Sequence, residues 1–138
     1  MKIFIKIFSL SFLSLIVTFN CHAACSIYKA KTAEETIVGI KSWSDLDEHF
    51  AEFHSCDDGA IAEGYSDVIS MLLTKKWKEL NSLKIDDEFK KFIVSHIDKT
   101  WKESEITSAS NNVNSYCIDN IKEICEAIMI LSNNFSKL

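Results

Sequence analysis

Four carboxylates gather in the stretch "CDDGAIAEGYSDVISMLL", which covers residues 56–73: Asp57, Asp58, Glu63 and Asp67. Glu63 and Asp67 stand four residues apart, so they share one face of any helix that contains both. Paired carboxylates act as general acid and base only where different surroundings separate their pKa values. No apolar residue flanks these two on their own face, so the pattern favours a solvated acidic surface over a reaction centre.

The same stretch also has the features of a helix start. Asp57 or Asp58 can accept hydrogen bonds from the free N–H groups of the first turn, and a negative charge is stabilised there by the helix dipole. With His54 just before them, the four carboxylates are the strongest candidates for binding a protein partner. We therefore interpret the stretch first as a capped helix start and second as a protein-binding edge.

Other residue patterns that could support catalysis are weak. His49 and His54 lie five residues apart, which does not place them on one helical face, and His96 falls within an apolar stripe typical of a hydrogen-bonded core histidine. Ser66 lies in "GYSDV", which is not the G-x-S-x-G turn of a nucleophilic serine. Phosphate loops and dinucleotide fingerprints are absent from the sequence. The sequence therefore predicts a protein without enzymatic activity and without a cofactor.

The amino-terminal segment "MKIFIKIFSLSFLSLIVTFNCHAAC" resembles an export signal. Two lysines precede an apolar run from Ile7 to Phe19, which is shorter than the roughly 20 residues of a membrane span. We expect residues 1–23 to form a cleaved signal peptide, with a retained amino-terminal anchor as the alternative. A lipoprotein with an acylated Cys21 is disfavoured, because no small residue precedes that cysteine. The mature chain, residues 24–138, would then be a single periplasmic or secreted domain.

Four cysteines remain after cleavage: Cys25, Cys56, Cys117 and Cys125. An even number of cysteines in a small exported domain predicts two disulfides. Zinc is disfavoured, because the sequence has no Cys-x-x-Cys spacing and no nearby histidine to complete a ligand set.

We expect the pairs Cys25–Cys56 and Cys117–Cys125. Eight residues of continuous helix would hold the second pair about 12 Å apart, beyond bridging distance. This pairing therefore requires the chain to break and double back near Cys117. Without such a break, Cys117 would have to reach Cys25 or Cys56 instead.

The charge of the mature chain limits its partners. Without Lys2 and Lys6, 13 basic side chains face 20 acidic ones, a formal net charge of −7. Such a chain is a poor ligand for nucleic acid, whose phosphates require clustered basic residues. It suits a basic protein partner, and no membrane association is expected after cleavage.

Apolar residues at three- and four-residue steps predict four or five amphipathic helices. One opens at Ser44 with Asp47 three residues on; others cover residues 58–80, 86–101, 104–117 and 118–135. Residues 36–41, "TIVGIK", are ambiguous between a short strand and an extended lead-in. The predicted fold is an all-α bundle closed by two disulfides.

The helix predicted for residues 58–80 carries a continuous apolar stripe from Ile61 to Leu80. Tyr65 and Trp77 lie on that stripe, which favours core packing over exposed interface anchors. Gly59 and Gly64 weaken the helix intrinsically, so packing must hold it. We expect a glycine there either to let another backbone approach closely or to leave a concave spot for a partner.

The order of these features resembles that of small exported bacterial proteins: a signal, then "CDDGAIAEGYSDVISMLL", a tryptophan-containing helix, "FKKFIVSHID" and a carboxy-terminal cysteine pair. Among these are the periplasmic immunity proteins that neutralise cell-wall-degrading effectors of type VI secretion systems. The resemblance implies a small helical inhibitor that plugs the active-site groove of a secreted hydrolase or toxin.

Two hypotheses follow for the function. In the first, the acidic helix start docks on a basic or catalytic cleft of a secreted toxin. In the second, the chain is a structural or envelope-maintenance domain, and the same residues are only caps and solvated surface. A homodimer is compatible with both hypotheses.

Overall fold

The computed structural model describes residues 25–137, and the predicted signal peptide lies outside them. Seven α-helices and two short 3₁₀ helices make up these residues, and no strand occurs among them. The elements are α1 (Ile27–Ile37), α2 (Trp43–Phe53), η1 (His54–Cys56), α3 (Gly59–Lys75), α4 (Trp77–Leu80), α5 (Asp87–Ser95), α6 (Glu103–Tyr116), η2 (Asp119–Ile121) and α7 (Lys122–Phe135). The prediction of an all-α fold with two disulfides is confirmed.

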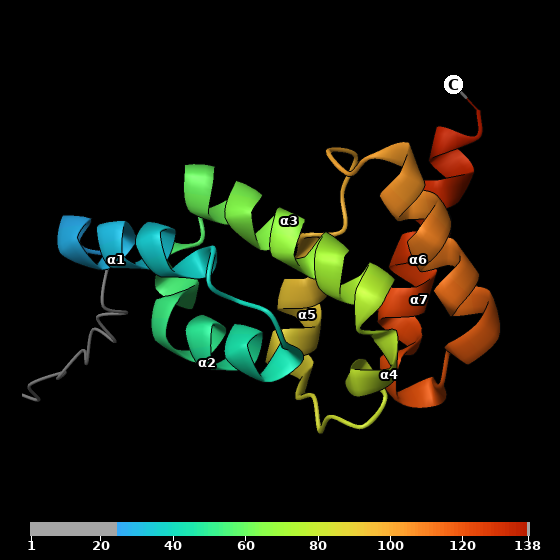
Figure 1. Ribbon diagram of the computed structural model, residues 1–138, viewed down its shortest axis with the longest axis horizontal. Helices are drawn as coiled ribbons and strands as arrows, with labels where there is room; N and C mark the ends of the chain where they lie inside the picture. The colour runs from blue at the N-terminus through green and yellow to red at the C-terminus, as the bar shows by residue number, and fades with distance from the viewer. Residues whose placement is uncertain (1–24, 138) are drawn as a thin grey trace, which may run out of the picture.

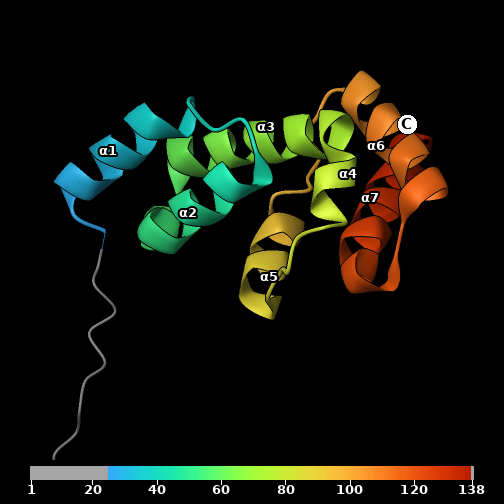
Figure 2. The same cartoon turned by 60° about the horizontal axis from the view of Figure 1, so that its bottom comes forward.

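The long helix α3 connects the two ends of the molecule (Figure 1). Helices α1 and α2 lie at its amino-terminal end, and α6 and α7 pack at the other. Figure 2 shows α4 and α5 on one side of α3, where α5 also contacts α7. The side chains of Tyr65, Ile69, Leu72 and Leu73 are fully buried, so α3 supplies the centre of the core.

Helix α3 is shorter than its apolar stripe predicts. The stripe continues to Leu80, but the helix ends at Lys75 and the chain re-enters helix as α4. The side-chain amide of Asn112 on α6 donates to the carbonyls of Leu73 and Thr74, at 2.9 and 3.1 Å. In a continuous helix these carbonyls would accept from the amides four residues later. Because Asn112 replaces those donors, the helix can end while Leu80 stays buried.

Helix α1 was not predicted. Residues 36–41 are neither a strand nor an extended segment throughout, because Thr36 and Ile37 form the last turn of α1. Only Ala33 and Ile37 of this helix are buried, which is too few to give a clear periodic signal. A Cβ built on Gly64 would lie 2.9 Å from the Cδ1 atom of Ile37. Gly64 therefore makes room for the side chain of Ile37 on α1, where a close approach by another backbone was expected.

The predicted start of α2 is two residues too late. Its N-cap is Ser42, whose side chain accepts from the amide of Asp45, while the Asp45 carboxylate accepts from the amide of Ser42. The spacing Ser-x-x-Asp occurs twice here, at Ser42 and at Ser44. With Ser42 as the cap, Trp43 is the first residue of α2, and its side chain is buried in the core.

The expected disulfides, Cys25–Cys56 and Cys117–Cys125, are both present. Helix α6 ends at Tyr116, and Cys117 has extended backbone angles of φ −68° and ψ 130°. The chain then turns back through η2 into α7, which places the Cα atoms of Cys117 and Cys125 6.3 Å apart. The predicted break near Cys117 is therefore confirmed.

Candidate functional site

The acidic residues predicted from the sequence surround the start of α3 but have different roles. Asp58 is the N-cap, and its carboxylate accepts from the amide of Gly59 at 2.8 Å. Gly59 has a positive φ of 51°, a conformation that side chains disfavour, so this cap requires glycine. Asp57 is half-buried and turns towards α5. One of the two aspartates therefore caps the helix, as predicted, and the other makes a long-range contact.

A hollow of about 290 Å³ lies between the start of α3 and the end of α5. Three carboxylates line it, from Asp57, Glu63 and Asp98, together with Ser66, His96 and Thr100. Asp58 and Asp67 are exposed but do not line the hollow, and the exposed His54 bonds through Nδ1 to the carbonyl of Phe50. Of the five predicted binding residues, only Asp57 and Glu63 thus meet in one concavity.

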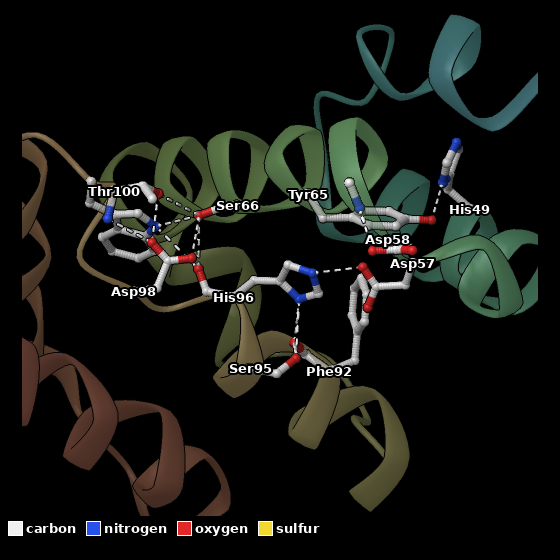
Figure 3. A network of polar contacts seen from close by, with 12 residues as sticks. His49, Asp57, Asp58, Tyr65, Ser66, Phe92, Ser95, His96, Asp98 and Thr100 are labelled. Carbon is white, nitrogen blue, oxygen red and sulfur yellow. Dashed lines mark hydrogen bonds and ion pairs between the residues drawn. The ribbon is translucent and has the colours of Figure 1, made fainter. Parts of the chain in front are cut away.

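His96 closes one side of the hollow and is 5 % exposed (Figure 3). Its Nε2 atom lies 3.0 Å from the Asp57 carboxylate, and its Nδ1 atom lies 2.8 Å from the carbonyl oxygen of Phe92. Both partners accept hydrogen bonds, so the ring satisfies them fully only when it carries both protons. His96 is therefore a hydrogen-bonded core histidine, as predicted, and its partners favour the cation.

The pKa of His96 follows from this geometry. Burial lowers the pKa, because it penalises the charged ring, but the hydrogen bonds to Asp57 and Phe92 and the charges of Asp57 and Asp98 raise it. The resulting pKa of His96 lies above the usual value of 6.5 for histidine. The ion pair thus joins α5 to the segment before α3, across 39 residues of sequence.

The loop after α5 supplies residues that sequence reasoning missed. Asp98 accepts from the amide and hydroxyl of Thr100 at 2.7 and 2.6 Å, which fixes its carboxylate beside the hollow. Trp101 donates from Nε1 to the Ser66 hydroxyl at 3.1 Å, and Ser66 donates to the carbonyl of His96. An aspartate two residues before a threonine is an ordinary turn signal, so only the tertiary fold reveals this cluster.

The Ser66 hydroxyl in this cluster is not paired with an imidazole base. It is buried and donates to the main-chain carbonyl of His96 at 3.1 Å, with a carboxylate oxygen of Asp98 at 3.4 Å as a second acceptor. The imidazole nitrogens of His96 are bonded to Asp57 and Phe92 instead. What this arrangement offers chemically is a negatively charged, hydrogen-bonding concavity.

A second buried histidine, His49, lies on the other side of Tyr65 (Figure 3). Its Nδ1 atom is 2.7 Å from the Tyr65 hydroxyl, and its Nε2 atom is 3.0 Å from the hydroxyl of Thr36. Thr36 donates its own proton to the carbonyl of Thr32, so it accepts from Nε2–H, and Nδ1 accepts from Tyr65. Burial lowers the pKa of His49, which is held neutral, and raises that of Tyr65.

Comparisons were made with protein-family models, curated proteins and solved structures. None of the three gave a match. The function must therefore be argued from the site itself.

Within residues 25–137, no group of three or more histidine, cysteine, aspartate or glutamate side chains is arranged to hold a metal ion. No helix among these residues is both long and apolar enough to span a membrane.

Proposed function

We propose that the chain is an exported, periplasmic inhibitor of the immunity-protein kind, which binds a secreted envelope-targeting effector through the start of α3. The observation that carries this proposal is the acidic hollow. Three carboxylates face it, and among the described residues that line it the one cationic group is the His96 ring, which is already paired with Asp57. A hollow of this size and charge accommodates one cationic side chain of a partner, which then forms charge-assisted hydrogen bonds.

The surroundings of the hollow support rigid docking. The Cys25–Cys56 disulfide ends one residue before Asp57, and the His96 ion pair fixes the Asp57 carboxylate from the other side. Asp98 is held by Thr100. A binding surface that is ordered before association loses less conformational entropy on binding.

A structural or envelope-maintenance domain is the second candidate. The observation that favours it is that Asp57 and Asp58 already have internal partners, His96 and the amide of Gly59. Glu63 separates the two functions, because it is exposed, lines the hollow and is neither a cap nor an ion-pair partner.

The test combines capture with one charge reversal. The oxidised protein is used to capture partners from the producing strain, and a captured secreted hydrolase is assayed for inhibition. We expect Glu63→Lys to weaken binding at least about tenfold, since a lysine in the hollow repels the partner's cation. Reversal of Asp58 is less informative, because that residue caps α3.

The matched control is Glu126→Lys on α7, an exposed residue that does not line the hollow, and it gives the same change in net charge. Its ion pair with Lys122 is surface-exposed and contributes little to stability. Equal inhibition by Glu63→Lys and the wild type would contradict the proposal and favour the structural role.

A further inference from the structure

The outer face of α1 exposes large apolar side chains that the proposed function does not use. Ile27, Tyr28 and Val38 are 91, 81 and 80 % exposed. The opposite face of the helix is satisfied, because Ala33 and Ile37 are buried where α1 packs on α3. Helix α1 lies at the end of the molecule remote from α6 and α7, so its outer face is accessible (Figure 1).

Four exposed residues form a narrow stripe along this face: Ile27, Lys31, Glu34 and Val38. The steps of four, three and four residues keep them within about 60° of one another around the helix. Val38 continues the stripe, because it retains helical backbone angles of φ −66° and ψ −16°. The stripe therefore has an apolar residue at each end and a cation and an anion between them.

The order of this stripe is self-complementary. Ile27 and Val38 are equally far from its midpoint, and so are Lys31 and Glu34. When a second copy of the helix is turned end to end, each apolar end meets an apolar end and each charge meets its opposite. A parallel arrangement would instead place Lys31 against Lys31, which is repulsive.

We propose that α1 is a dimerisation surface, on which α1 of a second copy packs antiparallel across a two-fold axis. Ile27 then packs on Val38 of the second copy, Lys31 pairs with Glu34, and both contacts occur twice, as an isologous interface requires. Within one chain, Lys31 lies 3.7 Å from Glu35, and both side chains are mostly exposed. Such a surface pair is weak and leaves the lysine free to bridge the two copies.

The size of α1 limits the strength of this dimer. Eleven residues of helix are about 17 Å long, and one such face buries less than the roughly 800 Å² per partner of a standard stable interface. The dimer is therefore a weak one that forms at high local concentration. It does not involve the hollow at the start of α3, so it stands or fails independently of the proposed inhibitor function.

The experiment is sedimentation velocity on the purified, oxidised protein between about 10 µM and about 1 mM. We expect a reversible monomer–dimer equilibrium. Lys31→Glu and Glu34→Lys each bring like charges together twice per dimer, so each raises the dimer Kd at least about tenfold. The double variant K31E/E34K restores the charge pattern and returns the Kd to within about threefold of the wild type.

A mixture of the two single variants gives the sharpest result. One carries two anions on the stripe and the other two cations, so the mixture forms a heterodimer although neither variant dimerises alone. A change that merely loosened α1 would not be rescued by mixing. Lys84→Glu, an exposed reversal outside α1, serves as the control and leaves dimerisation unchanged.

A monomer at every concentration would overturn the proposal. A dimer that ignores all charge changes on α1 would also overturn it, because association would then use another face. Capture of a different protein through α1 with no self-association would assign the stripe to that partner instead.

Discussion

Two histidines are buried on opposite sides of Tyr65, and their surroundings favour different protonation states, neutral for His49 and cationic for His96 (Figure 3). The ring centroid of Tyr65 lies 5.3 Å from that of His49 and 5.6 Å from that of His96. His49 meets two hydroxyl groups, whereas His96 meets a carboxylate and a carbonyl. Both histidine side chains are similarly buried. Their hydrogen-bonding partners, more than their burial, therefore decide which of the two rings carries a positive charge.

The two sites also differ in what they connect. His49 lies on α2 and bonds to α1 and α3, so its network is internal to one end of the bundle. His96 bonds to the segment that enters α3, beside the acidic hollow. The neutral histidine thus belongs to the core, and the charged one positions a residue of the candidate site.

Removal of Asp57, the carboxylate partner of His96, should have the largest effect on stability. We expect Asp57→Ala to lower the free energy of unfolding at pH 6 by about 2 kcal/mol, because a buried imidazolium loses a charged hydrogen bond. Asp57→Asn keeps a hydrogen-bond acceptor for His96, so its free energy of unfolding should fall by about half as much. Urea denaturation measures both, with Asp47→Ala, an exposed carboxylate of α2, as the control. If Asp57→Ala were as stable as that control, the ion pair would contribute nothing.

Removal of the hydroxyl partner should have a smaller effect. Tyr65→Phe leaves the buried Nδ1 atom of His49 without a donor, at a cost of about 1 kcal/mol. Tyr28→Phe, which removes an exposed hydroxyl, should leave stability unchanged. Equal stability of both variants in thermal and urea unfolding would indicate that water or another group replaces the Tyr65 hydroxyl.

The smallest expected effect is the pH dependence, which has opposite signs at the two sites. The folded-state pKa of His96 is raised, so its stabilisation is complete below pH 6.5 and is lost as the pH rises through that raised pKa. The pKa of His49 is lowered, so its contribution is present above pH 6.5 and is lost as the pH falls towards the lowered pKa.

Imidazole proton shifts measured by NMR should therefore give a titration midpoint above 6.5 for His96 and below 6.5 for His49. The stability difference between the wild type and Asp57→Ala should shrink from pH 6 to pH 9. Two midpoints in the reverse order would contradict the assignment of charges.

Much of the fold could be predicted from local patterns. The stripes of α2, α3, α5, α6 and α7 repeat at helical spacing, and the expected Cys117–Cys125 pairing required a break near Cys117. Helix α1 escaped prediction because it buries only Ala33 and Ile37. The early end of α3 depends on Asn112, a side chain nearly 40 residues away, so no local pattern contains it.

For the candidate site, the sequence predicted only local features, such as the helix cap at the start of α3. Carboxylates next to a glycine indicated the cap that Asp58 forms, and an apolar stripe indicated that His96 is a core residue. The pairing of His96 with Asp57, and the position of Asp98 beside the hollow, depend on how α5 packs against α3. Long-range packing of this kind leaves no trace in residue spacing.

The two disulfides close loops of very different length, and this difference has a consequence for the unfolded chain. Cys25 and Cys56 are 31 residues apart, and Cys117 and Cys125 are 8 apart. Because the entropy removed from the unfolded chain grows with the logarithm of loop length, the longer loop restricts it by about 1 kcal/mol more. The first bridge therefore contributes more to holding the bundle closed, whereas the second mainly fixes the local reversal between α6 and α7.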